Sequence, residues 1–124
     1  MAWELPGVVL PLVAGADLST HQFKFVSVAA DEQVDPTGAG LLAVGVLQNK
    51  PSAAGQAATV MQTGVSKVEA GGTVAAGGPV MADSVGRAVA ATGTGAFVLG
   101  SAIEGGAVGE LITVSLGICG GQLN

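Results

Sequence analysis

The chain has 124 residues and a mass of 11.9 kDa, which suits one domain with one hydrophobic core. Its formal net charge is −5 and its four basic residues are scattered singly, so the sequence argues against nucleic acid as a partner. Charged residues make up 10% of the chain, against about 25% in an ordinary soluble domain, so we expect another protein to cover part of the surface.

The apolar residues are mostly small. Hydrophobic residues make up 49% of the chain but aromatic residues only 3%, and small side chains bury little area each. A thin core of this kind favours a homo-oligomer; the alternative is a monomer with a neutral Ser, Thr and Gly exterior. Uncharged runs such as 88–103 fall short of the roughly 20 apolar residues that span a bilayer, so no membrane contact is expected. A secretory signal peptide is not expected either.

Residues 1–14 are predicted to form an extended apolar arm that precedes a single β-rich domain, 15–124. Pro6 and Pro11 interrupt the arm, forbid a regular helix and suit only an edge strand. The arm is either the first edge strand of its own domain or a segment that reaches another chain. In the second case its contact residues would be Trp3, Glu4, Leu5, Val8, Val9 and Leu10, with Trp3 as the anchor.

A half-buried strand is predicted within residues 18–29, where Phe23, Phe25 and Val26 alternate with polar residues. Phe23 and Phe25 are expected on one face of this strand. Together with Phe97 they would supply much of the aromatic core.

The sequence holds no complete metal or catalytic set. His21 has no second His or Cys at ligand spacing, so a solvated or capping role is favoured. Asp31, Glu32 and Asp35 form a polar turn, but they lack the spacing of a calcium loop, and nothing fixes a substrate-sized gap between two acids. The single cysteine, Cys119, is predicted to be a small apolar residue near the end of the last strand. We therefore expect no cofactor, no metal and no enzyme activity.

The stretch 41–68 is predicted to form a β-hairpin around which the rest of the chain is organised. Two apolar runs, 41–47 and 57–68, flank a turn from Gln48 to Gln56, whose Asn, Pro, Ser and Gly residues break regular structure. The β-branched residues of the second run suit a pleated surface better than a helix.

A similar pattern returns at 98–114, where an apolar run, a Gly-rich turn and a second run follow one another. The second runs match at Gly55 and Gly109, at the amide or acid that follows each glycine, and at a Thr-Val pair. These matches predict two equivalent hairpins that face each other across one core, with Gly55 and Gly109 at equivalent turns. Chance similarity between two Ala- and Gly-rich segments is the alternative.

A Val-x-x-Gly-Gly unit occurs at 68–72 and again at 74–78, and its paired glycines supply the positive φ angles of tight turns. The unit resembles one in the biotinyl and lipoyl carrier domains, where such turns precede a hairpin that bears a modified Lys. Residues 81–86 contain no Lys, so the attachment chemistry is absent. A carrier or accessory β-domain of an enzyme complex, lacking the modified lysine, is the alternative function.

Turn residues recur about every 8 to 12 residues and no segment shows a sustained helical period, which predicts an all-β fold, a compact barrel or sandwich of short strands. From Val13 to Leu116 the order of elements resembles the capsid decoration, or head-cement, proteins of tailed bacteriophages. The resemblance is carried by Gly45-Val46-Leu47, the turn to Gly55, Thr59-Val60, Gly64-Val65, Lys67-Val68, Gly86-Arg87-Ala88-Val89, Leu99-Gly100, and Gly109-Glu110 leading into Val114.

The resemblance implies a tulip-like β-domain that trimerises and sits on the outer surface of a mature capsid, with the major capsid protein as its partner. On this interpretation the chain is a structural virion protein. It would bridge neighbouring major capsid proteins and stabilise the shell by added contact area, and the arm of residues 1–14 is predicted to grip the capsid. An enzyme with an unrecognised site is a further class that the sequence leaves open.

Overall fold

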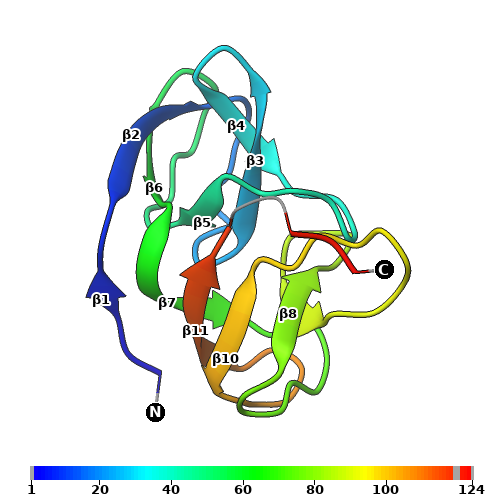
Figure 1. Cartoon of the computed structure of the whole chain (residues 1–124). Coiled ribbons are helices and arrows are strands. Elements are labelled where there is room, and N and C mark those ends of the chain that lie inside the picture. The colour runs from blue at the N-terminus through cyan, green and yellow to red at the C-terminus, as the bar shows by residue number, and fades with distance from the viewer. Residues whose placement is uncertain (1, 119–120, 124) are drawn as a thin grey trace.

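The computed structural model describes residues 2–118 and 121–123, and every regular element in this part of the chain is a β-strand (Figure 1). The prediction of an all-β fold is confirmed. The strands are β1 (Leu5–Pro6), β2 (Val9–Ala14), β3 (Phe25–Ala30), β4 (Gln33–Pro36), β5 (Gly45–Leu47), β6 (Ala57–Met61), β7 (Thr63–Glu69), β8 (Pro79–Ala82), β9 (Ala88–Ala90), β10 (Gly100–Glu104) and β11 (Leu111–Gly117).

Five strands of the N-terminal half close into a barrel in the order β2-β4-β3-β5-β6. β2 pairs antiparallel with β6, from Val9 opposite Met61 to Val13 opposite Ala57, and its end pairs parallel with β4. The strands are short and rich in Val and Ala, whose compact side chains fill the narrow interior of a small barrel.

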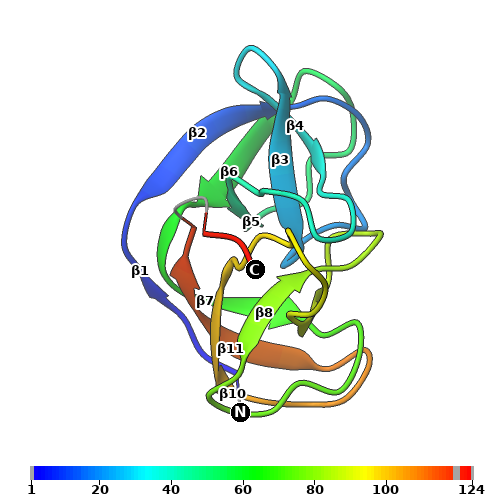
Figure 2. The ribbon, with the colours of Figure 1, turned by 45° about the vertical axis from the view of Figure 1, so that its right-hand side comes forward.

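The remaining strands form a six-stranded sheet in the order β1-β7-β11-β10-β8-β9. A parallel bridge between Ala70 and Ala88 brings the end of β7 beside the start of β9, so the five strands β7 to β11 also curl towards closure. β1 lies outside this ring and adds to the free edge of β7. The barrel and the sheet lie one above the other, with β1 and β2 running along one side (Figures 1 and 2).

The first half of the chain, 9–61, and the second half, 63–117, repeat the same strand pairing. Strands β2 to β6 correspond in order to β7 to β11, and the parallel contact of β2 with β4 is matched by the Ala70–Ala88 bridge. Three pairs in the first half each have a counterpart in the second half. Val26↔Gly45 corresponds to Val80↔Gly100, Val28↔Val34 corresponds to Ala82↔Ala88, and Leu47↔Val60 corresponds to Ala102↔Val114. The similarity predicted for two hairpins therefore extends to two complete five-stranded units.

Positive φ angles recur at equivalent positions of the two halves. Phe23 has a φ of 63° and corresponds to Gly77, which has a φ of 84°. The Phe23 N–H donates a hydrogen bond to β5, and the Gly77 N–H donates one to the equivalent strand β10. Glu32, with φ of 60°, sits in the β3–β4 turn where Gly86, with φ of 85°, sits in the β8–β9 turn. The strained conformation of the two non-glycine residues thus belongs to a bend that the duplicated fold requires.

The buried residues fall into two clusters, whereas the sequence predicts one core. The first fills the closed barrel and includes Leu18, Val26, Val34, Leu47 and Val60. The second fills the other half and is larger. Two cores form because each five-stranded unit curls around its own small side chains. The first predicted hairpin contributes to both cores, and the second predicted hairpin packs in the second core.

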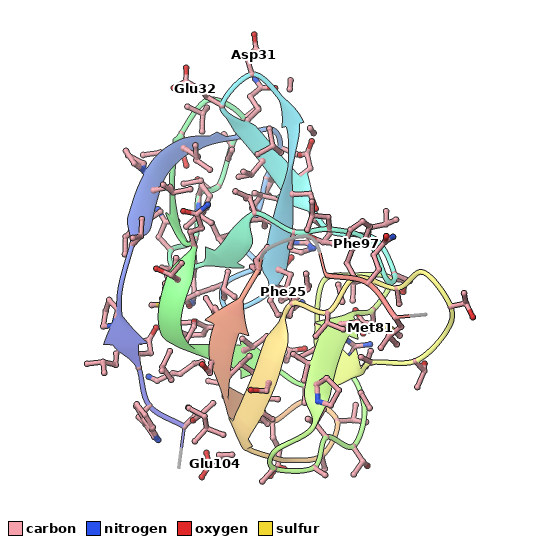
Figure 3. All side chains as sticks on the ribbon, viewed as in Figure 1. Phe25, Asp31, Glu32, Met81, Phe97 and Glu104 are labelled. Carbon is pink, nitrogen blue, oxygen red and sulfur yellow. The ribbon has the colours of Figure 1, made fainter. Side chains whose placement is uncertain are left out.

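Three outward-facing residues of the first barrel extend the second core. Phe25, Val46 and Met61 are neighbours across β3, β5 and β6, and each is at most 1% exposed. Figure 3 shows Phe25 between the two halves. The counterparts in the second half are Pro79, Ser101 and Ser115, and none of them is buried. The same row of positions is therefore an internal contact in one half and a polar surface in the other.

The aromatic core differs from the prediction, because only Phe25 of the three Phe residues is fully buried. Phe23 precedes β3 with a positive φ, so it does not share a strand face with Phe25. Its carbonyl accepts a hydrogen bond of 2.9 Å from the Glu69 N–H. Phe97 is half-buried against the second core.

The predicted hairpin of residues 41–68 is present in its first part, where β5 pairs antiparallel with β6. Its second run is interrupted at Gln62, so that β6 belongs to the first half and β7 to the second. The second predicted hairpin corresponds to β10 and β11, which pair antiparallel.

Residues 1–14 are predicted to form an extended arm that is either the first edge strand of its own domain or a segment that reaches another chain, and the structure pairs β1 and β2 within the chain's own sheets. β2 is one of the five barrel strands, and Ala14 is fully buried. The segment before β2 lies outside the two duplicated units. The boundary predicted at residue 14 therefore cuts through the barrel, whereas Pro6 and Pro11 lie at strand edges, as the sequence predicts.

Candidate interaction surface

The N-terminal segment lies along the outer edge of β7. Leu5 pairs with Val65, and the Gly7 N–H donates a hydrogen bond of 3.1 Å to the Thr63 carbonyl. Gly64 allows this close approach: a Cβ there would lie 2.7 Å from the Leu5 carbonyl oxygen. The Trp3 N–H reaches further across the sheet and donates to the Thr113 hydroxyl at 3.2 Å.

Four apolar side chains of this segment remain exposed, and together we call them the arm patch: Trp3, Leu5, Val8 and Val9. Trp3 is 45% exposed and Leu5 is 64% exposed, even though their backbones are held by the sheet. An aromatic and an aliphatic side chain that are fixed in place but uncovered are typical of a protein contact surface. Of the other residues predicted for this site, Leu10 is half-buried in β2.

The remaining member of the predicted set, Glu4, belongs to a small charged group beside the arm patch. Its carboxylate lies 4.0 Å from the Lys67 ammonium, which also sits 5.6 Å from the centre of the Phe23 ring. All three side chains are partly exposed, so each contact contributes little to stability. The Glu4–Lys67 pair thus places one ion pair at the edge of the arm patch.

The two prolines turn their nitrogens to the outer edge of their strands. The Ala14 N–H donates towards the loop before β6, whereas the Val13 N–H donates to Glu32 beside β4. Because backbone groups alternate along a strand, Pro11 points away from β6, and Pro6 likewise points away from β7 since the residue after it donates to β7. The outer edge of β1 and β2 thus lacks two backbone N–H donors. A partner protein would therefore contact the arm patch mainly through side chains and less through backbone pairing.

Gly55 and Gly109 occupy equivalent turns, with φ angles of 89° and 84°. The Gly55 N–H donates to Ala14 at the end of β2, and the Gly109 N–H donates to Ala70 just after β7. Both glycines therefore close the same bend in the two halves, two residues before β6 and β11.

Acidic residues and the single His do not converge on a site. Asp31 and Glu32 lie in the exposed β3–β4 turn, at the end of the molecule remote from Glu104 (Figure 3). Within residues 2–118 and 121–123, no group of three or more His, Cys, Asp and Glu side chains is placed to hold a metal ion. His21 contacts the Thr20 hydroxyl through Nδ1 at 3.2 Å, and its pKa is lowered by partial burial and by the Lys24 charge. Cys119 lies outside the described residues.

The β8–β9 turn, where a carrier domain would bear its lysine, is fixed by Asp83. Its carboxylate accepts hydrogen bonds from the Val85 and Arg87 N–H groups and pairs with the Arg87 guanidinium at 2.8 Å. The exposed residues of this turn are Ser84 and Val85, neither of which can carry the cofactor linkage.

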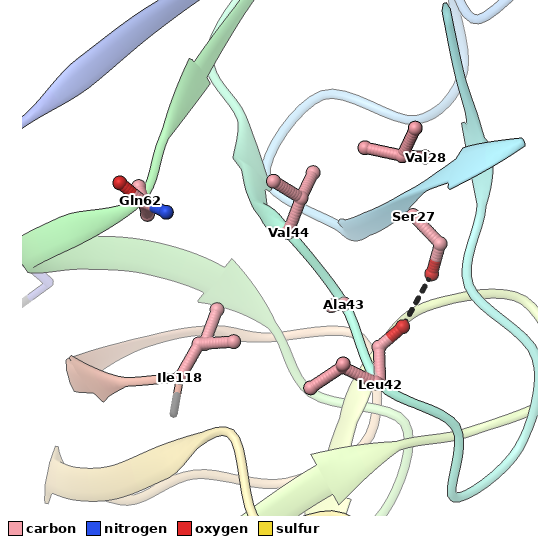
Figure 4. A pocket seen from close by; sticks show the side chains of 7 residues that line it. All are labelled: Ser27, Val28, Leu42, Ala43, Val44, Gln62 and Ile118. Atoms are coloured by element: carbon pink, nitrogen blue, oxygen red, sulfur yellow. Dashed lines mark hydrogen bonds between the residues drawn. The ribbon is translucent and has the colours of Figure 1, made fainter. Parts of the chain in front are cut away.

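A second apolar surface, which the sequence did not indicate, is a hollow of about 450 Å³ between β3 of the first barrel and the end of β11 (Figure 4). We call it the barrel hollow; it is lined by Ser27, Val28, Leu42, Ala43, Val44, Gln62 and Ile118. Val28 is 54% exposed and Leu42 44%, and no charged residue lines the hollow. The Ser27 hydroxyl donates to the Leu42 carbonyl at 2.8 Å and so fixes one wall. In the sequence these residues read as ordinary strand positions, so no signal marked them.

Comparisons with known proteins identify the fold and no closer relationship. No family model and no curated protein matches the sequence. Among solved structures, the chain is similar to one described as the head fiber gp8.5 N base in bacteriophage phi29, with a TM-score of 0.70 and 18% sequence identity. The match covers 94% of this chain and 98% of that one, so the two share the whole fold.

The described residues contain no helix that could cross a membrane.

Proposed function

We propose that this chain is a structural component of a phage head that binds the outer surface of the capsid. The observation that carries the proposal is the fold shared, over nearly the full length of both chains, with the N base of a phage head fiber. The order of motifs that resembles the capsid decoration proteins supports the same class independently of that structure. Within this class the chain would act through contacts alone, as a non-enzymatic protein.

The arm patch is the surface we assign to the capsid. Trp3 and Leu5 are exposed while their backbones are anchored to Thr113 and Val65, so they would lose little conformational entropy on binding. The chain would contact neighbouring major capsid proteins with this edge and resist their separation. A homotrimer, as in the decoration proteins, would present three arm patches to one local junction of the shell.

The test is co-sedimentation of the purified chain with expanded capsids assembled from the major capsid protein of the same genome. We expect saturable binding with a fixed number of chains per capsid. Trp3→Ala should weaken binding by about 2 kcal/mol, as expected for an aromatic hot spot, whereas Val85→Ala, at an exposed apolar residue of the β8–β9 turn, should not change it. The far-ultraviolet spectra of both variants should match the parent chain.

The absence of binding by the folded parent chain would contradict the proposal. If Trp3→Ala and Val85→Ala weakened capsid binding equally, the assignment of the arm patch would be contradicted, but the proposed capsid binding would not. Light scattering of the free chain and chain counts on the capsid together measure the oligomer, since a trimer that forms only on the shell appears in the second measurement.

A further inference from the structure

Thr113 is one of three polar side chains that are buried in the described part of the chain. The hydroxyls of the other two, Thr37 and Ser66, bond to side chains of the first half. The Thr113 hydroxyl instead accepts a hydrogen bond of 3.2 Å from the Trp3 N–H, in the segment that lies outside the two duplicated units. This buried group of β11 is therefore directed at the arm.

The internal duplication gives Thr113 a counterpart in the first half, which is Thr59. Each of the two threonines directly precedes a valine of the equivalent pairs Leu47↔Val60 and Ala102↔Val114. Thr113 lies between Ile112 and Val114, which are both in the second core, so its side chain points to the outer face of the sheet. It is nevertheless fully buried, whereas Thr59 is half-buried. We attribute the extra burial to the N-terminal segment, which crosses the second half at Thr113.

Trp3 and Glu4 are held by two residues that lie opposite each other on β11 and β7. Thr113 binds Trp3, and its cross-strand neighbour Lys67 pairs with the Glu4 carboxylate at 4.0 Å. The backbone pairing of β1 with β7 begins only at Leu5. The ion pair is partly exposed and contributes little, whereas a hydrogen bond to a buried hydroxyl is shielded from water. Thr113 is therefore the main anchor of the residues before β1.

We infer that Thr113 is a positioning residue for Trp3: its hydroxyl fixes the backbone from which the indole projects and so holds the arm patch ready for its partner. Valine has nearly the same shape as threonine but no acceptor, so with valine at this position the Trp3 N–H would turn to water and the residues before β1 would leave the sheet. A side chain that is fixed before binding loses less conformational entropy on binding. The effect of Thr113 on capsid binding rests on the function proposed above, whereas its effect on Trp3 does not.

The test uses Trp3, the single tryptophan of the chain, as a fluorescent reporter. Thr113→Val should raise the acrylamide quenching constant about twofold, because the Trp3 side chain is 45% exposed when held and would be fully exposed when released. Thr113→Ala also lacks the hydroxyl and should give the same rise, whereas Thr113→Ser keeps the hydroxyl and should behave like the parent chain. Thr59→Val, the same substitution at the counterpart in the first half, is the matched control and should leave the quenching unchanged.

The capsid assay described above supplies a second measurement. Thr113→Val should weaken binding about three- to tenfold, the cost of ordering one side chain on binding, and so less than Trp3→Ala. Combined with Trp3→Ala it should cause no further loss, since no indole is left to position. A residue that merely stabilised the fold would weaken binding equally with and without the indole.

Three results would overturn the inference. Unchanged quenching in Thr113→Val and Thr113→Ala would show that the hydroxyl does not hold Trp3, and an equal rise in Thr113→Ser or Thr59→Val would show that the hydroxyl at this position is not the cause. Equal losses of capsid binding by Thr113→Val with and without Trp3→Ala would reduce Thr113 to a structural residue. The quenching measurement needs no capsid, so if the parent chain does not bind capsids the proposed function fails, while the quenching still decides whether Thr113 positions Trp3.

Discussion

The duplicated turns at Gly55 and Gly109 allow a quantitative test of the internal repeat. Both residues have φ angles near +85°, and a Cβ added to either would meet no heavy atom within 4 Å. The cost of a side chain is therefore backbone strain alone, about 1 to 2 kcal/mol for an L-residue in the left-handed region. Alanine also restricts the unfolded chain, which offsets about 0.4 to 1 kcal/mol of this strain.

We expect Gly55→Ala and Gly109→Ala each to lower the free energy of unfolding by about 1 kcal/mol, and the valine variants by about 1 to 3 kcal/mol. The two effects should be equal and should add in the double variant, because the glycines belong to different five-stranded units. Gly117→Ala is the matched control: its site is equally open but its φ is not positive, so its effect should stay within about 0.5 kcal/mol.

Urea unfolding followed by circular dichroism measures these differences. Unchanged stability in Gly55→Ala and Gly109→Ala would refute the strain argument. A large effect at one glycine and none at the other would refute the equivalence of the two turns.

Three further predictions concern other parts of the fold. Phe25→Ala should lower the free energy of unfolding by about 3 to 5 kcal/mol in the same urea assay, because it removes the aromatic side chain that joins the two halves. Gly64→Ala should displace β1 and red-shift the fluorescence of Trp3 while far-ultraviolet circular dichroism keeps the signal of the barrel, since the new Cβ would overlap the Gly7 nitrogen. His21 has a native pKa below its usual 6.5, so stability should be fully present above pH 6.5 and fall as the pH drops through the lower native pKa; His21→Gln should flatten this dependence in thermal melts.

Much of the fold follows from local sequence signals. Alternation, β-branched residues and turn glycines predict the all-β class, and the match between Gly55 and Gly109 points to the repeat. The full duplication is hidden because equivalent positions carry different residues: the turn glycines Gly77 and Gly86 are matched by Phe23 and Glu32. The two halves share their strand pairing and backbone geometry, and a comparison of their sequences residue by residue does not detect either.

The two exposed apolar surfaces also differ in how far the sequence predicts them. The arm patch could be predicted, because apolar residues between prolines at one end of the chain are conspicuous in a sequence with few charges. Its attachment to β7 could not be predicted, because it depends on the close approach of Gly64 to residues nearly sixty positions earlier in the chain. The barrel hollow could not be predicted either, since Val28 and Leu42 are apolar residues whose exposure depends on how the first barrel meets the end of β11.

The divergence between the halves leads to a last prediction about self-assembly. Phe25, Val46 and Met61 dock the first half onto the second, whereas the equivalent row, Pro79, Ser101 and Ser115, holds two hydroxyl groups and is not buried. A polar outer face of this kind prevents further stacking in repeat proteins.

Restoring the apolar row should therefore let the stack continue between molecules. In the double variant Ser101→Val and Ser115→Met, apolar side chains replace the two serines of the row on the second half, and molecules should associate through this row. Analytical ultracentrifugation should show species that grow with concentration, whereas the matched double variant Ser101→Thr and Ser115→Thr, which keeps both hydroxyls, should stay in the state of the parent chain. If the Val and Met variant does not associate, the polarity of this row is not what keeps the second half from docking.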